Sequence, residues 1–278
     1  MTSFVEANGL RFAYEEEGSG KLVLLIHGFP DTPQTWDHAL PALAAAGFRA
    51  VAPFTRGYAP TEIPKDGDFS GDTLGRDVLA LIDALGAKSA IVVGHDWGAS
   101  AAYSAAAMDP DKVEKLVTVA IPHPASIKPS LSLAWTMRHF VAFKLPGAAS
   151  RARANDFAVI DELVRRWSPA WDVPKGETDA VKAAFREPGS LEAALGYYRA
   201  IGLGLPASQR KRIKVPTVAF AGLHDMIAPE AYDKASSRFL NGYRVVKMPG
   251  GHFMHREHPE VFVKELVAAL QENASAPV

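Results

Sequence analysis

The chain has 278 residues, of which 48% are hydrophobic and 22% charged, and its formal net charge is −1. This is the composition of an ordinary globular protein, and it excludes the strongly basic balance of many nucleic-acid-binding proteins. No apolar run approaches the ~20 residues that a bilayer-spanning helix needs, and the start, Met1–Phe4, shows no secretory pattern. We therefore expect a cytoplasmic protein that binds neither nucleic acid nor membrane.

Metal and disulfide chemistry find little support in the sequence. The chain has no cysteine, which excludes disulfides and thiolate metal sites. His224, His255 and His258 show no metal-ligand spacing on one helix face, so we expect them at the surface. The basic run 209–212 is interpreted as a solvated face. We expect no metal and no organic cofactor.

Short apolar runs alternate with amphipathic segments, which predicts a parallel sheet with helices on both faces. The chain opens with a hairpin over 4–14 around an Asn-Gly turn. Later strands are predicted at 22–26, 49–52, 90–93, 116–119, 218–221 and 244–246. Helices are predicted at 35–46, from Thr73 to Gly86, and at 99–108.

The pattern changes in the middle of the chain. From about residue 125 to residue 212 there is no strand-like run, and helices rich in Trp, Arg and Tyr alternate with Pro and Gly. Strand character then returns. We predict one α/β core domain formed by residues 1–124 and 213–278, interrupted by a helical lid of residues 125–212.

The most informative motif is Gly94-His95-Asp96-Trp97-Gly98, which follows a predicted strand and opens a predicted helix. This is the nucleophile-elbow pattern with Asp96 in the position of the usual serine. We expect the glycines to permit a tight turn that raises Asp96 above the strand end, and His95 to order the elbow. The alternative is that Asp96 only caps the helix.

Two further residues favour the interpretation of Asp96 as a nucleophile. His252 follows the strand at 244–246, and Asp225 follows the strand at 218–221. Loops after parallel strands share one edge of a sheet, so these side chains can meet Asp96 there. Their chain order is that of the α/β-hydrolase triad. Each could alone be an ordinary loop residue, but their joint placement predicts a catalytic triad.

A fourth element is His27-Gly28-Phe29-Pro30, directly after the buried strand. The backbone N–H groups of Phe29 and Trp97 can form an oxyanion hole. Pro30 supplies no N–H, and its peptide bond can be cis. The alternative is a plain turn, but its position opposite the elbow favours a site in which His27 and Pro30 border the substrate pocket.

These motifs together resemble the epoxide hydrolase family, over essentially the whole chain. The resemblance implies an α/β-hydrolase fold with a mostly parallel eight-stranded sheet, helices on both faces and an inserted lid. The same carboxylate-nucleophile branch contains haloalkane and haloacetate dehalogenases. A carboxylate such as Asp96 forms a stable ester with a saturated carbon, and His252, oriented by Asp225, can activate the water that hydrolyses it.

Ring opening needs a proton donor for the leaving oxygen, and the family resemblance implies two lid tyrosines. Tyr198 matches the second of them; alternatively, Tyr197 and Tyr198 only pack on a lid helix. The position of the first falls near His139, and a histidine takes this place in a subset of the family. His139 could equally be a helix residue that faces solvent or another lid residue. Tyr197 and Trp135 are expected to line the pocket.

Other positions weigh against dehalogenation. Phe29 lacks the side-chain amide that many haloalkane dehalogenases use to hold halide, and Trp97, Ala99 and Ser100 stand where haloacetate dehalogenases carry arginines. The leading hypothesis is therefore hydrolysis of a small-molecule epoxide to a vicinal diol, with water as co-substrate. Dehalogenation is the second hypothesis, and a non-catalytic ligand-binding protein of the same fold is the third. A homodimer is left open.

Overall fold

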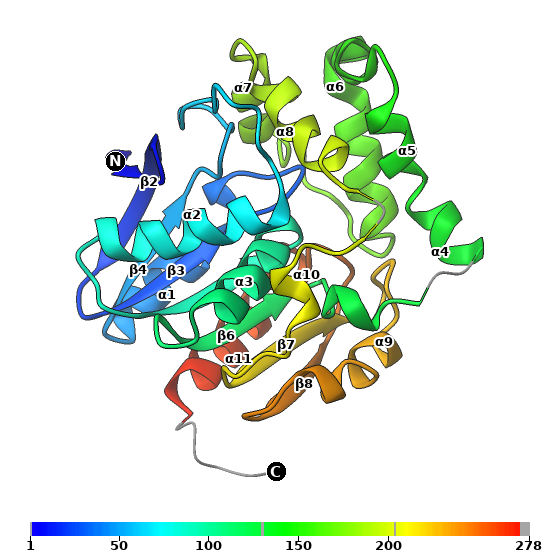
Figure 1. The fold of residues 1–278 in the computed structure, drawn as a ribbon. Coiled ribbons are helices and arrows are strands. Elements are labelled where there is room, and N and C mark those ends of the chain that lie inside the picture. Colours follow the sequence, from blue (N-terminus) through cyan, green and yellow to red (C-terminus); the bar gives the residue numbers. More distant parts are fainter. Residues whose placement is uncertain (1, 129–130, 203, 273–278) are drawn as a thin grey trace.

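One mixed sheet forms the centre of the molecule. The computed structural model describes residues 2–128, 131–202 and 204–272, and within these ranges eight strands form one sheet in the order β1-β2-β4-β3-β5-β6-β7-β8 (Figure 1). Strands β3 to β8 pair in parallel, and β2 is antiparallel to both its neighbours. The prediction of a mostly parallel eight-stranded sheet is confirmed. The strands are β1 Ser3–Ala7, β2 Leu10–Gly18, β3 Lys21–Ile26, β4 Phe48–Pro53, β5 Ala90–His95, β6 Val113–Val119, β7 Thr217–Gly222 and β8 Tyr243–Met248.

The hairpin forms where its turn residues predict it. Asn8 and Gly9 both have positive φ, 45° and 75°, and Ala7 pairs with Leu10 across the turn. Two successive residues with positive φ match the right-handed twist of the two strands, which explains the Asn-Gly sequence.

Alternate residues of β3 enter two different cores. Leu22, Leu24 and Ile26 pack with residues of α2 and α3, whereas Val23 and Leu25 pack with residues of α1 and α11. Figure 1 shows these two pairs of helices on opposite faces of the sheet. A strand covered on both faces reads as one continuous apolar run, which is why it was recognisable in the sequence. The four helices are α1 Ala39–Ala45, α2 Gly71–Ala84, α3 Trp97–Met108 and α11 Pro259–Gln271.

The helix predicted over 35–46 is wrong in its first four residues. A separate 3₁₀ turn spans Pro33–Trp36, and α1 begins only at Ala39. Proline favours the first position of a helical turn, because its φ is fixed and it needs no hydrogen bond there. Pro33 therefore starts a turn of its own, which buries Trp36 completely.

Between β6 and β7, the described residues form five α-helices inside the range predicted as the lid, and we call them the lid helices. They group on one side of the core in Figure 1. Their bounds are α4 Leu131–Thr136, α5 Arg138–Lys144, α6 Ala148–Trp167, α7 Asp179–Arg186 and α8 Ser190–Arg199; the remaining short helices are α9 Glu230–Asp233 and α10 Met254–Glu257. None of the helices in the described ranges has the length and hydropathy needed to cross a membrane.

Candidate active site

Asp96 occupies a sharp turn between β5 and α3. Its φ of 52° and ψ of −117° lie outside the regions that most residues adopt, and such strain is often found at functional sites. The flanking glycines are needed because a side chain would not fit there, and not because their φ is positive. A Cβ on Gly98 would lie 2.1 Å from the Ile26 carbonyl oxygen, and one on Gly94 would lie 2.3 Å from the Gly98 oxygen. The elbow is therefore possible because the backbones approach closely, and Asp96 itself takes the unusual conformation.

The three predicted triad residues meet at one edge of the sheet. His252 Nε2 lies 3.4 Å from Asp96 Oδ2, and its Nδ1 donates to Asp225 Oδ1 at 3.1 Å. The side chains of His252 and Asp225 are fully buried, and that of Asp96 is 13% exposed. Because β5, β7 and β8 are parallel, their carboxyl ends deliver all three residues to the same place.

The charges of this site shift the pKa values of both Asp96 and His252. Burial raises the pKa of Asp96, but the hydrogen bond and charge of His252 more than reverse this, and the net pKa is below its ordinary value. Burial lowers the pKa of His252, but Asp225 and then Asp96 raise it to about 10. At neutral pH the site is thus an imidazolium held between two carboxylates. Removing the charge of Asp96 would lower the pKa of His252 toward the range of a base.

The loop after β3 supplies the first predicted oxyanion donor. Phe29 N–H donates to Asp96 Oδ1 at 2.9 Å. The loop lies directly against the elbow, since a Cβ on Gly28 would be 2.4 Å from Asp96 Oδ1 and 2.6 Å from Trp97 N. Trp97 begins α3, and the Phe29–Pro30 bond is cis. The loop thus brings the Phe29 N–H to the Asp96 carboxylate, and the same loop lies against the Trp97 nitrogen at the start of α3.

A cavity of about 400 Å³ opens beside Asp96, and its lining is mostly apolar. Trp97 and Tyr197 form part of the wall next to the nucleophile. Near Ser100, Gln209 contributes a polar group that the sequence did not reveal. It is 2% exposed, and its Nε2 donates to Ser100 Oγ at 2.8 Å and Ser104 Oγ at 3.1 Å. The prediction that the whole run 209–212 is solvated is wrong at Gln209, which a 3₁₀ turn directs inward.

Of the four residues predicted to line the substrate pocket, Tyr197 does so. His27 is buried behind the loop: its Nε2 accepts from Thr55 N–H at 3.0 Å, and its Nδ1 donates to the Gly28 oxygen at 2.9 Å, so it holds the loop in place. Pro30 borders a separate small cavity. Trp135 is 71% exposed on α4, under the guanidinium of Arg138. The structure does not bring Trp135 to the site, because this short helix lies at the margin of the lid.

The lid places two predicted donors near Asp96. The Tyr198 ring lies 5.3 Å from both the Phe29 and the Trp97 rings, centre to centre, and is 1% exposed. Burial, followed by the charge of Asp96, raises the pKa of Tyr198 well above its ordinary value, so it stays a phenol. The His139 ring lies 5.7 Å from the Tyr198 ring, centre to centre, and is 5% exposed, so it does not face solvent. It also packs on another lid residue, Trp167, as the alternative interpretation allows. Neither ring lines the 400 Å³ cavity; both lie in the aromatic cluster beside it.

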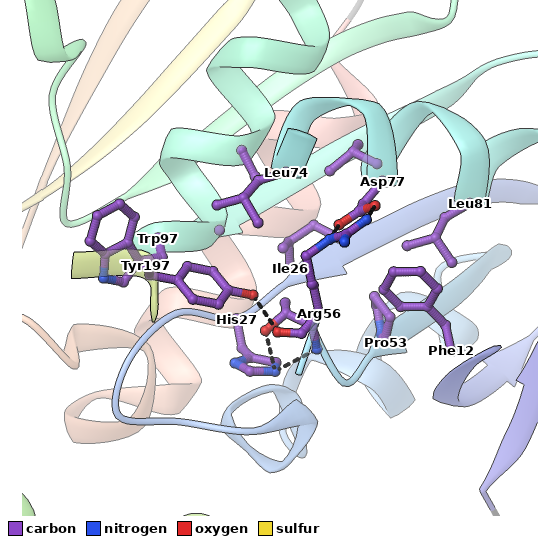
Figure 2. A pocket seen from close by; sticks show the side chains of 14 residues that line it. Phe12, Ile26, His27, Pro53, Arg56, Leu74, Asp77, Leu81, Trp97 and Tyr197 are labelled. Carbon is purple, nitrogen blue, oxygen red and sulfur yellow. Dashed lines mark hydrogen bonds and ion pairs between the residues drawn. The ribbon is translucent and has the colours of Figure 1, made fainter. Parts of the chain in front are cut away.

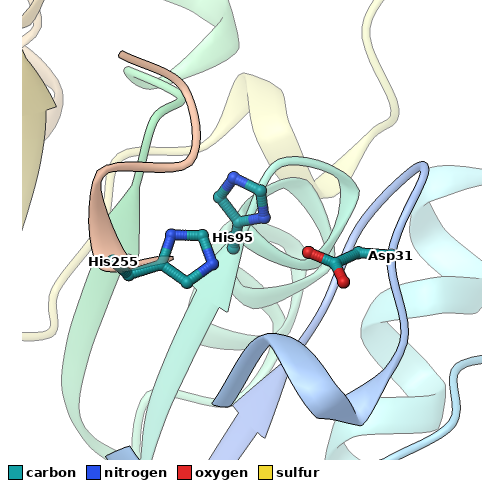
Figure 3. Close-up of side chains that lie close together, drawn as sticks. All are labelled: Asp31, His95 and His255. Atoms are coloured by element: carbon teal, nitrogen blue, oxygen red, sulfur yellow. The ribbon is translucent and has the colours of Figure 1, made fainter. Parts of the chain in front are cut away.

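Three further buried groups, Asp31, His95 and His255, lie close together (Figure 3). His95 Nε2 donates to the backbone oxygen of His252 at 3.0 Å, which fits its predicted ordering role. His255 contacts Thr35 and is 2% exposed, so the prediction of a surface role is wrong. One ligand atom from each of the three lies within 4.8 Å of the others, a spacing that could hold a metal ion. The Arg256 guanidinium lies 3.9 Å from Asp31 Oδ1 and already compensates the negative charge of that carboxylate.

Four buried histidines predict that the folded protein loses stability in acid. Burial lowers the pKa of His95 and His123 to about 3 and that of His27 and His139 to about 4. Below about pH 6.5 these histidines bind protons in the unfolded chain but not in the folded protein. The free energy of unfolding therefore falls by about 1.4 kcal/mol per histidine for each pH unit, until the pKa of the folded state is reached. Two groups act in the opposite direction: Asp31, whose pKa burial raises to about 6, between that value and 3.8, and His252, whose pKa its carboxylate neighbours raise to about 10, between that value and 6.5.

Because the four histidines with lowered pKa outweigh the groups that act in the opposite direction, we expect the free energy of unfolding to fall by several kcal/mol between pH 7.5 and pH 5. Urea denaturation at the two pH values measures it. A His123→Asn variant should lose less over the same interval, because it removes one of the groups. Equal stability at both pH values would contradict this explanation.

Comparison with known proteins agrees with this geometry. The family model described as alpha/beta hydrolase fold matches residues 21–259. The AB hydrolase superfamily protein YfhM of Bacillus subtilis is 30% identical, over 97% of each chain. Epoxide hydrolase A of Mycobacterium tuberculosis is 28% identical, over 96% of this chain and 95% of its own. The structure of a laboratory-evolved variant of potato epoxide hydrolase aligns with a TM-score of 0.83 and 26% identity, over 98% of each chain. The chain belongs to the α/β-hydrolase superfamily.

Proposed function

We propose that this protein is an epoxide hydrolase that converts an epoxide to a vicinal diol through an ester on Asp96. The observation that carries the proposal is a carboxylate at the elbow, with Phe29 N–H on one oxygen and His252 at the other, beside a mostly apolar cavity. Carboxylate nucleophiles suit saturated electrophilic carbon, because attack on an ester or amide would produce a high-energy anhydride. The epoxide hydrolases among its relatives support the same activity.

The first step is ring opening. An oxygen of Asp96 attacks one ring carbon, the carbon–oxygen bond of the ring breaks, and the electron pair leaves on the former ring oxygen. Tyr198 donates its phenolic proton to this oxygen. Tyr197 is less suited to donate, because its hydroxyl already donates to the Arg56 carbonyl at 2.8 Å. His139, neutral at neutral pH, can offer a ring N–H as a second hydrogen bond to the same oxygen.

The second step is hydrolysis of the ester. When Asp96 loses its charge, the pKa of His252 falls, and its proton can restore the phenol of Tyr198. Neutral His252 then takes a proton from water, and the hydroxide attacks the Asp96 carbonyl carbon. The N–H groups of Phe29 and Trp97 stabilise the resulting oxyanion. Collapse releases the diol, whose new hydroxyl takes the proton from His252, and the acid left on Asp96 returns a proton to His252.

The proposal predicts that a Tyr198→Phe variant loses about 100-fold or more in the rate of ester formation, since general acid catalysis contributes 10²–10⁴-fold. A rapid-quench assay of the enzyme–substrate ester measures this rate. Folding should be retained, because only a hydroxyl is removed. A rate within twofold of the wild type would move the donor role to another residue.

The activity itself is tested on a panel of epoxides with the diols separated by chromatography, and on haloalkanes and haloacetates with halide release as readout. We expect diol formation and no comparable halide release. Phe29 has no side-chain amide to hold a halide, and Ser100 on the cavity wall carries no charge for a carboxylate. Halide release without diol formation would establish dehalogenation instead.

A further inference from the structure

Helix α8 is tied to one loop of the core near both of its ends. Near its start, Ser190 Oγ donates to the Gly57 oxygen at 3.2 Å and accepts from Ala59 N–H at 3.1 Å. Near its end, the Tyr197 hydroxyl donates to the Arg56 carbonyl oxygen at 2.8 Å (Figure 2). Ser190 and Tyr197 are both buried, so these hydrogen bonds are shielded from water. The loop 55–60 therefore fixes where α8 lies on the core.

The same loop is anchored to α2 by a buried ion pair. Arg56 Nε and Nη2 donate to the two oxygens of Asp77, each at 2.7 Å, and the side chains are 3% and 7% exposed. Asn8 Nδ2 also donates to Asp77, at 2.6 Å. Figure 2 shows the Arg56 side chain held against Asp77, beside its own carbonyl that receives Tyr197. A bidentate pair of this kind is geometrically specific, so the acceptor of the Tyr197 hydroxyl cannot shift freely.

Two glycines allow helix and loop to touch. A Cβ on Gly57, whose φ is 79°, would lie 2.5 Å from Ala193 Cβ on α8. A Cβ on Gly196 would lie 2.5 Å from the Phe69 ring, whose centre is 5.4 Å from that of the Tyr197 ring. The contact is thus closely packed as well as hydrogen-bonded.

Tyr198 follows Tyr197 directly, so whatever fixes one fixes the other. The Tyr197 ring packs against Tyr58 and Phe69, and the Tyr198 ring packs against Phe29. Both rings also contact Trp97, which follows the nucleophile. A proton donor must lie within hydrogen-bond reach of the oxygen that it protonates, and a misplacement of about 1 Å can cost on the order of 100-fold in rate.

We infer that Tyr197 and Arg56 are positioning residues that hold the Tyr198 hydroxyl where ring opening requires it; this inference rests on the proposed function. It is specific to one step. Ester hydrolysis depends on His252 and Asp225, which come from the loops after β8 and β7 and make no hydrogen bond to α8 among the described residues. Loosening α8 should therefore slow ester formation and leave ester hydrolysis unchanged.

The test is a Tyr197→Phe variant, which removes one hydroxyl, with styrene oxide as substrate. Rapid quench and mass spectrometry of the intact protein give the rates of ester formation and ester hydrolysis separately. We expect ester formation to slow about tenfold, with hydrolysis within twofold of the wild type. Ser190→Ala, at the other end of α8, should act in the same direction.

The matched control is Tyr103→Phe. Tyr103 is also a fully buried tyrosine, and its hydroxyl bonds Thr118 Oγ1 at 2.9 Å and the Ile121 oxygen at 3.1 Å, away from α8. It should lower thermal stability to a similar extent and change neither rate. If Tyr197→Phe only lowers stability as this control does, or slows both steps equally, the positioning role is refuted. If Tyr198→Phe itself leaves ester formation unchanged, the donor assignment fails, and the inference falls with it.

Discussion

A His252→Gln variant is expected to complete ring opening and then stop with the ester on Asp96. The carboxylate and the lid donor needed for the first step remain, but no base is left to activate water. His252 is the group whose pKa depends on the charge of Asp96, so its role as a base begins only once the ester has formed. Turnover should fall about 1,000-fold or more, since general base catalysis contributes up to 10⁴-fold.

The measurement is the mass of the intact variant after incubation with an epoxide. One equivalent of substrate should be added, and peptide mapping should place it on Asp96. His38→Gln, an exposed histidine, is the matched control and should turn over normally without an adduct. Loss of turnover without any adduct would mean that His252 is required before the ester forms, contrary to the proposed sequence of steps.

An Asp96→Asn variant should lose at least about 10⁴-fold in turnover, because no other group can take the place of a covalent nucleophile. Asparagine has nearly the same size and shape as aspartate, so it fits the same turn between β5 and α3, and folding should be preserved. Circular dichroism and a diol assay check both points. Asp83→Asn, an exposed carboxylate on α2, should keep wild-type activity. Substantial diol formation by Asp96→Asn would show that water attacks the epoxide directly.

The parts of the fold that sequence alone predicted are those with strong local signals. Strands covered on both faces, such as β3, appear as unbroken apolar runs, and the Asn8-Gly9 turn has a mechanism in its positive φ values. The first four residues of the helix predicted at 35–46 were wrong, because the buried Trp36 continues the apolar pattern of the helix but belongs to a separate 3₁₀ turn that begins at Pro33.

The triad was predictable because parallel strand ends place Asp96, Asp225 and His252 at one edge. Residues that act through distant contacts were not. His255 reaches the catalytic centre through packing with Thr35, 220 positions earlier. Gln209, next to three basic residues, points inward only because a 3₁₀ turn rotates it. Trp135 was predicted in the pocket from its residue type, and such a choice carries no information about which side of a short helix meets the core.

The most direct test of the covalent mechanism is a single turnover of the wild-type enzyme in ¹⁸O-labelled water. With enzyme in excess over epoxide, the oxygen of the attacking water should enter the Asp96 carboxylate, and the first diol should contain only unlabelled oxygen. Mass spectrometry of the peptide that contains Asp96 detects the label, and a second cycle in ordinary water should transfer it to the diol. Label in the diol of the first turnover, with none on Asp96, would contradict the ester intermediate.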